Sequence, residues 1–209
     1  DTPDVGEWRF DGHNMSRVVA HKTASMGMVR TFQLTKSLTK MTVIENMKLG
    51  AIHQVGEKWW KGLLPFLWKS QEAKIEERAD TLLKRFKMDH MRNEYAGTLS
   101  GGQRKLLEMA RALMTEPKLV MLDEPMAGVN PALKQSLNEH IRGLRDDGMT
   151  VLFVEHDMDM VNDVADWVVV MAEGILIAEG TPEQIGSNPQ VIEAYLGSNQ
   201  GKSLLDRQV

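Results

Sequence analysis

Two short apolar runs separated by one long amphipathic stretch constrain this chain most. KLVMLDEP at 118–125 and MTVLFVEHD at 149–157 both have the pattern of buried strands. The stretch from 130 to 148 has the pattern of a helix, with Asn130 as its N-cap and Pro131 in its first turn. A strand, a helix and a second strand in this order predict an α/β fold, in which a largely parallel sheet is covered by helices.

The remaining elements are predicted from the same periodicities. Apolar spacing near three or four residues indicates helices, alternation indicates strands, and glycines mark turns. On this basis we expect a turn and short strand at 3–12, helices at 16–24, 40–53, 70–88 and from Gly101 to 114, a short helix at 158–166, and a hairpin around Glu173 and Gly174.

Composition excludes several classes of function. The net charge of −4 and the lack of a basic tail argue against a dedicated nucleic-acid binder, so we expect no nucleic-acid partner. The sequence has no cysteine, which excludes disulfides and fits a reducing compartment. No apolar run approaches the span of a bilayer, and the six histidines are scattered without the spacing of metal ligands.

Two adjacent acids follow the first apolar run, at the end of a strand where open α/β sheets place their ligands. Asp123 could hold Mg²⁺ there, and Glu124 could orient or deprotonate a water molecule. Acids also commonly close strands without any chemical role, and the two residues alone do not decide between these interpretations.

The stretch TLSGGQRKLLEMARAL at 98–113 carries a second candidate site. Ser100 is placed as a helix cap, and Gly101 and Gly102 leave the backbone bare at the helix start. Exposed N–H groups together with the positive end of a helix suit an anion such as a terminal phosphate. The alternative is an ordinary helix with a glycine-rich cap, although this does not explain why serine, two glycines and glutamine stand together.

Two more residues complete a series: Gln33 ends RTFQ before the glycine-rich stretch, and His156 in FVEHD follows the second apolar run. Taken in order, these four segments resemble the motifs of ATP-binding cassette (ABC) proteins, and the chain looks like the nucleotide-binding subunit of an ABC transporter. The resemblance implies that Gln33 contacts Mg²⁺ and links to the membrane subunit. It implies that Asp123 binds Mg²⁺, that Glu124 is the catalytic base, and that His156 contacts the γ-phosphate. It assigns the signature motif, which faces ATP held by a partner domain, to Leu99, Ser100, Gly101, Gly102 and Gln103.

The finer resemblance is to subunits that serve branched-chain amino-acid uptake, through MAGVNP, VEHDMDMV and EGTPEQI. The connecting D-loop falls on Ala127, Gly128, Val129 and Asn130. Asparagine at 130, where aspartate is common in the wider family, puts an acid-mediated contact across the dimer in doubt. The implied function is an ATP-hydrolysing subunit that energises an importer. The alternatives are a soluble ABC ATPase and a non-hydrolysing docking or regulatory fragment.

The resemblance also implies cofactors, partners and location. ATP and Mg²⁺ would lie between two such domains, which pair as a homodimer or heterodimer. The pair would bind transmembrane permease subunits, with an extracytoplasmic solute-binding protein as an indirect partner, and would lie on the cytoplasmic face of the cell membrane. The aromatic residues of the segment 57–69 either dock the permease or pack onto neighbouring helices; they are Trp59, Trp60, Phe66 and Trp68.

The implied architecture is a P-loop NTPase-like domain over 1–197, followed by a tail at 198–209. Its RecA-like parts are expected at about 1–37 and 116–186, and an α-helical subdomain at about 38–115. GSNQGKS at 197–203 has three residues between its glycines, whereas a phosphate loop needs four. In the family that loop precedes a segment like PDVGEWRFDG. We therefore expect residues 1–209, which lack the loop and its lysine, to be inactive alone.

Overall fold

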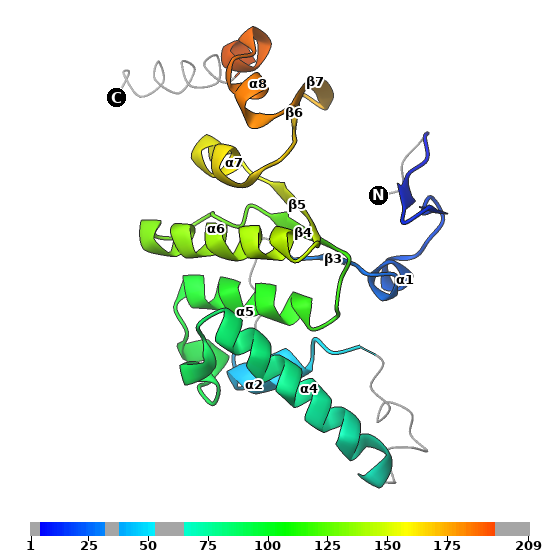
Figure 1. The fold of residues 1–209 in the computed structure, drawn as a ribbon, viewed down its shortest axis with the longest axis vertical. Helices are drawn as coiled ribbons and strands as arrows, with labels where there is room; N and C mark the ends of the chain where they lie inside the picture. Colours follow the sequence, from blue (N-terminus) through cyan, green and yellow to red (C-terminus); the bar gives the residue numbers. More distant parts are fainter. Residues whose placement is uncertain (1–4, 32–37, 53–64, 195–209) are drawn as a thin grey trace. The chain divides into compact units, whose positions relative to one another are not determined.

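The computed structural model describes residues 5–31, 38–52 and 65–194 (Figure 1). The chain divides into two compact units, Asp1–Val154 and Glu155–Val209. Each unit is described by itself below.

A parallel sheet of three strands forms the centre of the first unit, in the order β3 (Met28–Arg30), β4 (Leu119–Asp123) and β5 (Thr150–Val154). Met28 pairs with Leu119, and Leu119 pairs with Thr150, so the two outer strands flank β4 in parallel. This arrangement confirms the predicted α/β class. The unit begins with a small antiparallel hairpin and a helix, which are β1 (Arg9–Phe10), β2 (His13–Asn14) and α1 (Ala20–Ser25).

Burial differs between the two predicted strands. Val120 and Leu122 of β4 are buried, as predicted. The prediction that β5 is a buried strand is wrong for one of its faces, because Leu152 is 53% and Val154 62% exposed. In the described part of the sheet β5 pairs with β4 alone, so it lies at the edge, where a helix covers one of its faces.

That covering helix is α6 (Pro131–Asp146), which contacts β5. Its start is as predicted, because the Asn130 side chain accepts a hydrogen bond from the backbone N–H of Leu133 at 2.9 Å. One face of α6 is buried through Leu137, Ile141 and Leu144. Because these residues recur every three to four positions, they lie on one side of the helix and form its packing surface, as the periodicity in the sequence predicts.

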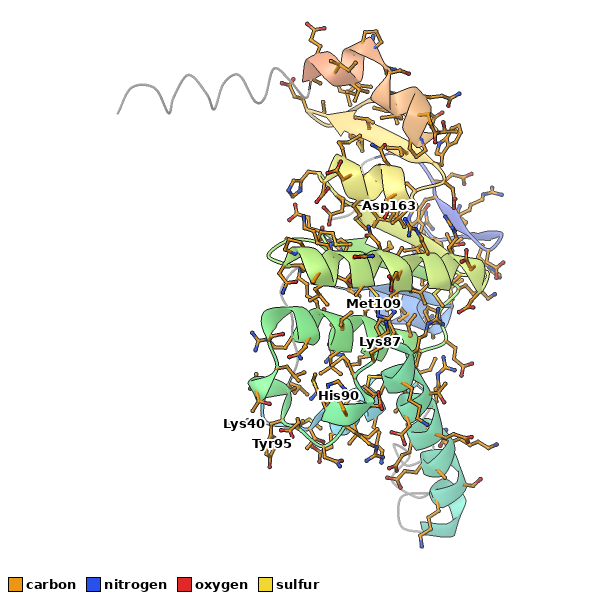
Figure 2. All side chains as sticks on the ribbon, turned by 60° about the vertical axis from the view of Figure 1, so that its left-hand side comes forward. Lys40, Lys87, His90, Tyr95, Met109 and Asp163 are labelled. Carbon is orange, nitrogen blue, oxygen red and sulfur yellow. The ribbon has the colours of Figure 1, made fainter. Side chains whose placement is uncertain are left out.

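Three helices pack together beyond the sheet and form what we call the helical cluster: α2 (Val43–Lys48), α4 (Pro65–Arg85) and α5 (Gly101–Leu113). The short 3₁₀ turns η2 (Asp89–Met91) and η3 (Ala96–Thr98) connect α4 to α5. Figure 2 shows Lys40 and Tyr95 together at one end of the cluster, where Thr42 forms a β-bridge with Tyr95.

The helix boundaries differ from the predicted ones. Helix α2 is shorter than the predicted 40–53. The capping box of Thr42 and Glu45 sets its start, and the helix ends at Lys48. Helix α4 begins at Pro65 rather than at residue 70. Trp59 and Trp60 lie outside the described residues, as do the side chains of Phe66 and Trp68. The choice between permease docking and packing therefore remains open.

Asn46 is a fully buried polar residue of the helical cluster. Its side-chain oxygen accepts from the backbone N–H of Leu38 at 2.9 Å, and its amide nitrogen donates to the carbonyls of Leu38, Met41 and Thr42 at 3.1, 3.3 and 2.9 Å. Because burial of an amide is costly without such partners, the four bonds stabilise the turn that enters α2.

The second unit contains α7 (Met158–Val164), the antiparallel strands β6 (Val168–Ala172) and β7 (Ile175–Gly180), and α8 (Pro182–Gly186). The predicted hairpin is confirmed, because Glu173 and Gly174 form its turn with φ of +50° and +79°. The core of the second unit consists of Ala178, Ile185 and Val191. Across the described ranges of the chain, none of the helices combines the length and apolar character needed to cross a bilayer.

Candidate functional site

Asp123 is the last residue of β4, and its carboxylate is paired with a cation. The guanidinium Nη2 of Arg30 donates to Oδ2 of Asp123 at 2.9 Å. Arg30 ends the neighbouring strand β3, so the parallel register brings the two strand ends to the same edge of the sheet. The carboxylate thus lies where the sequence predicted it, at the carboxyl edge of the parallel sheet.

Glu124 follows immediately in an uncommon backbone conformation. Its φ is +43°, in the left-handed region that residues other than glycine rarely adopt. Its backbone N–H donates to the carbonyl of Val154 on β5 at 3.0 Å. Its own carbonyl accepts from the N–H of Ala127 at 3.1 Å. These bonds turn the chain sharply after β4 and fix the backbone from which the Glu124 side chain leaves.

Lys105 of α5 reaches the same turn. Its ammonium Nζ donates to the carbonyls of Glu124 at 3.2 Å, Pro125 at 3.1 Å and Ala127 at 2.5 Å. A cavity of about 30 Å³ lies beside it, lined by the polar side chains of Thr31, Lys105, Glu108 and Asp123 together with apolar ones. The volume is enough for one or two water molecules.

The predicted signature segment forms the start of α5. Ser100 caps the helix: its hydroxyl accepts from the backbone N–H of Gln103 at 3.2 Å, and the Gln103 side chain accepts from the N–H of Ser100 at 2.8 Å. Leu99 is buried, and its carbonyl accepts from the guanidinium of Arg104 at 2.7 Å. The cap is as predicted, and the Gln103 side chain is engaged in it.

The two glycines of this segment differ. Gly101 is exposed, and a Cβ added there would have no atom within 4 Å outside its own helix and chain neighbours. A Cβ at Gly102 would lie 1.8 Å from Cδ2 of Leu133 on α6. Gly101 therefore has the open backbone that the sequence predicts for an anion site, whereas Gly102 permits close packing of α5 on α6.

The predicted D-loop forms the tight connection from β4 to α6. Gly128 adopts φ of +69°, and the N–H of Val129 donates to the carbonyl of Met126 at 3.2 Å. Asn130 then caps α6 with its side-chain oxygen. The asparagine at this position thus has a structural role in the chain itself, as a helix cap.

The other two predicted residues are not part of the described first unit. Gln33 lies outside the described residues. His156 belongs to the second unit, where its side chain is 74% exposed and its Nδ1 lies 4.0 Å from Oε2 of Glu155. The structure therefore brings Asp123, Glu124 and the signature helix into one unit, with His156 described in the other.

Sequence reasoning missed Arg30 and Lys105. Lys105 follows the signature motif by two residues, and Arg30 precedes Gln33 by three. Both act through contacts with residues distant in the sequence, Arg30 with Asp123 and Lys105 with the turn after it. Neither spacing carries a local signal, because lysine and arginine are ordinary residues of helix surfaces and strand ends.

The donor groups suit a magnesium nucleotide. The Asp123 carboxylate already accepts a cationic partner, and Gly101 leaves the helix start open. In the described part of the chain, no three His, Cys, Asp or Glu side chains are grouped to hold a metal by themselves. Mg²⁺ usually takes one or two carboxylates and completes its coordination with phosphates and water, and Asp123 offers one such carboxylate.

Comparisons with known proteins identify the family of the chain. A family model described as ABC transporter matches residues 1–127, and one described as branched-chain amino acid ATP-binding cassette transporter matches 176–199. The probable branched-chain amino acid transport ATP-binding protein LivG of Archaeoglobus fulgidus is 42% identical, with 95% of this chain and 77% of that protein covered. The high-affinity protein BraF of Pseudomonas aeruginosa is 40% identical, with 93% and 77% covered.

Solved structures give the same result. A nucleotide-free ATP-binding cassette from an ABC transporter superposes with a TM-score of 0.76 at 37% identity, covering 92% of this chain and 77% of that one. An ATP-binding cassette in its ADP conformation gives 0.75 at 35% identity, covering 93% and 78%. The chain therefore belongs to the ABC transporter family and has the fold of its ATP-binding cassette.

Proposed function

We propose that this chain is the ATP-binding and ATP-hydrolysing subunit of an ABC importer for branched-chain amino acids. The observation that carries the proposal is its similarity, over 93–95% of its length, to proteins named as branched-chain amino acid transport ATP-binding proteins. The chain spans 77% of the length of these relatives. The short match at 176–199 to the branched-chain amino acid family model supports the same substrate class.

The proposed mechanism assigns each group a task. Asp123 holds the magnesium ion, which when bound neutralises charge on the nucleotide phosphates. Glu124 accepts a proton from the attacking water, and its backbone is held by Val154 and Ala127. The exposed backbone at Gly101 and the hydroxyl of Ser100 bind the phosphates of ATP held by a second subunit. Gln33 would contact the magnesium ion, and His156 would contact the γ-phosphate.

The proposed assembly follows from this division of tasks. A second ABC ATPase subunit, identical or paralogous, completes the site, because the signature segment serves the nucleotide of the partner. Transmembrane permease subunits transmit the motion, and a solute-binding protein delivers the amino acid to them. The subunit is then peripheral, on the cytoplasmic face of the membrane.

A second candidate function is a non-hydrolysing docking or regulatory module. ATP hydrolysis by the assembled subunit, measured as follows, decides between the two.

Glu124→Gln tests the proposal in the subunit assembled with permease and solute-binding proteins in vesicles. We expect ATP-driven leucine uptake by the wild type, and in the variant a loss of ATP hydrolysis of about a hundredfold or more with ATP still bound, because glutamine cannot accept the proton. The control is Glu179→Gln, an exposed carboxylate of β7 in the second unit. Unchanged hydrolysis in Glu124→Gln would remove Glu124 from the role of base, and a wild type that fails to drive uptake would refute the transport assignment.

A further inference from the structure

We propose that Lys105 is a positioning residue, which holds the turn from Glu124 to Ala127 and thereby aims the Glu124 carboxylate. The inference rests on the proposed role of Glu124 as the catalytic base. It assigns a function in the reaction to a residue outside the sequence motifs, through a contact between the signature helix and the turn after β4 within one chain.

The helix that carries Lys105 is a fixed support. The capping box of Ser100 and Gln103 sets its start. Its inner face is buried through Leu107, Ala110 and Leu113, which are at most 2% exposed. A lysine that leaves a helix anchored in this way has a defined origin, so its ammonium can hold a second segment in place.

The ammonium engages the turn at three points. It donates to three backbone carbonyls, those of Glu124, Pro125 and Ala127, at 2.5 to 3.2 Å. Carbonyl oxygens that converge on one point repel each other, and a positive charge between them removes the repulsion. A charge-assisted hydrogen bond is also stronger than one between neutral groups.

The turn needs such support because of its backbone. Glu124 has φ of +43°, a conformation that costs a non-glycine residue of order 1–3 kcal/mol and persists only where the surroundings fix it. The N–H of Glu124 is held by Val154, and its carbonyl is shared by Ala127 and Lys105. Without the ammonium, one of the two donors to the Glu124 carbonyl is lost, and the side chain direction is less well defined.

The arrangement has a consequence for the signature segment. Ser100 and Gly101 lie within two turns of Lys105 on the same helix. A displacement of the helix start is therefore transmitted through the lysine to the backbone of Glu124 and to Ala127 at the start of the D-loop.

The test uses the assembled transporter with Lys105→Met, which keeps most of the side-chain length and removes the charge and all three donors. Lys105→Arg keeps the charge and several donors. The matched control is Lys84→Met on the exposed face of α4. Two readouts are measured: the kcat and KM for ATP hydrolysis, and backbone hydrogen exchange of the full chain over residues 124–130 and over α4.

We expect Lys105→Met to lower kcat about tenfold to a hundredfold with KM for ATP within about twofold, since misplacing a reacting group by an ångström or less has effects of this size. Exchange should rise over 124–130 and stay unchanged over α4. Lys105→Arg should recover most of the kcat, and Lys84→Met should behave as the wild type in both measurements.

Three results would overturn the inference. They are an unchanged kcat in Lys105→Met, a loss of kcat that Lys105→Arg does not restore, and an exchange increase that extends equally over α4, which would indicate general destabilisation. If Lys105→Met cannot be purified, Lys105→Gln replaces it in the same measurements. Glu124→Gln separates this inference from the proposed function: if that variant is inactive while Lys105→Met is normal, only the inference fails.

Discussion

Adjacent glycines in the signature segment serve different purposes. Gly101 opens the helix start to solvent, whereas a methyl group at Gly102 would meet the end of the Leu133 side chain, which would have to turn aside. The sequence presents both as one feature, a bare backbone for an anion. The structure shows that only the first has that openness, while the second lies against the Leu133 side chain.

His140 gives the molecule a pH-dependent stability. The ring is buried on α6, 4.4 Å from the Phe86 ring, with Ser136 Oγ at 3.4 Å. Burial, assisted by the nearby charges of Lys87 and Arg85 and opposed by that of Glu139, lowers the pKa of His140 below its usual range. Below about pH 6.5 the unfolded chain therefore binds a proton that the folded chain does not, and stability decreases as the pH falls towards the folded pKa.

Urea unfolding of the chain at pH 7.5 and pH 5.5 measures this effect. We expect a lower free energy of unfolding at pH 5.5, and a smaller difference between the two pH values in His140→Gln. The control is His90→Gln in η2, an exposed histidine that Figure 2 shows at the helical cluster. If His140→Gln has the same pH dependence as the wild type, the buried imidazole does not cause it.

Residues that act locally were predictable from the sequence. Asn130 with Pro131 and Ser100 with Gln103 are helix starts that depend on residues within three positions of each other. Lys105 and Arg30 were not predictable, because their partners are distant in the sequence. Lys105 binds a residue 20 positions away, and Arg30 binds one 93 positions away. Only the pairing of β3 with β4 and the packing of α5 bring these groups together.

At the level of elements, the ends of α2 and α5 approach each other at Gly50. A Cβ there would lie 2.4 Å from the carbonyl oxygen of Arg111 and 3.0 Å from Cβ of Met114. Because the nearest atom belongs to the backbone, side-chain rotation cannot relieve the contact. The glycine therefore sets the closest approach of the two helices.

Gly50→Ala should destabilise the chain by about 1–3 kcal/mol, the usual cost of forcing extra volume into a packed interface. Chemical denaturation measures this, with Gly186→Ala as the control. At Gly186, the last residue of α8, an added Cβ has no atom within 4 Å outside its own helix and chain neighbours, so we expect a change within about 0.5 kcal/mol. Equal effects at the two positions would show that the α2–α5 contact is looser than described.

Elements with strong periodicity were predicted well, and burial less so. The helix of α6 and the strand of β4 follow the expected boundaries closely. The apolar run of β5 predicted burial on both faces, but Leu152 and Val154 face away from the helix that covers it. Periodicity identifies a strand, whereas its burial depends on which other segments cover it.

At the scale of the whole molecule, we expect residues 1–209 by themselves to bind MgATP with a dissociation constant of about a millimolar or weaker. A phosphate loop and its lysine supply much of the charge stabilisation of the β- and γ-phosphates in related ATPases, and this stretch contains no such spacing. Isothermal titration measures the affinity, with a full-length LivG relative as the positive control. A micromolar constant would contradict the prediction.

The sequence predicted the family and the order of its motifs, but not how they are grouped. Asp123 and Glu124 fall in the first unit and His156 in the second, and the helix α6 and the strand β5 lie between these motifs in the chain. The proposed boundary between RecA-like parts and a helical subdomain, at about 38 and 115, stays a prediction. Composition and spacing identify such segments individually, whereas their assembly depends on contacts between them.

The ion pair of Arg30 with Asp123 affects how tightly the carboxylate binds an incoming cation. The Arg30 guanidinium is tethered beside Asp123, so it competes for the carboxylate at an effective concentration that does not change on dilution. A dissolved divalent ion competes for the same carboxylate only at its bulk concentration. Exposed pairs of this kind contribute up to about 1 kcal/mol, so the competition amounts to a few-fold. The guanidinium weakens the binding of a bare ion and of a nucleotide-chelated ion by the same factor, so an ion that keeps its place beside Asp123 needs the additional attachments that a nucleotide provides.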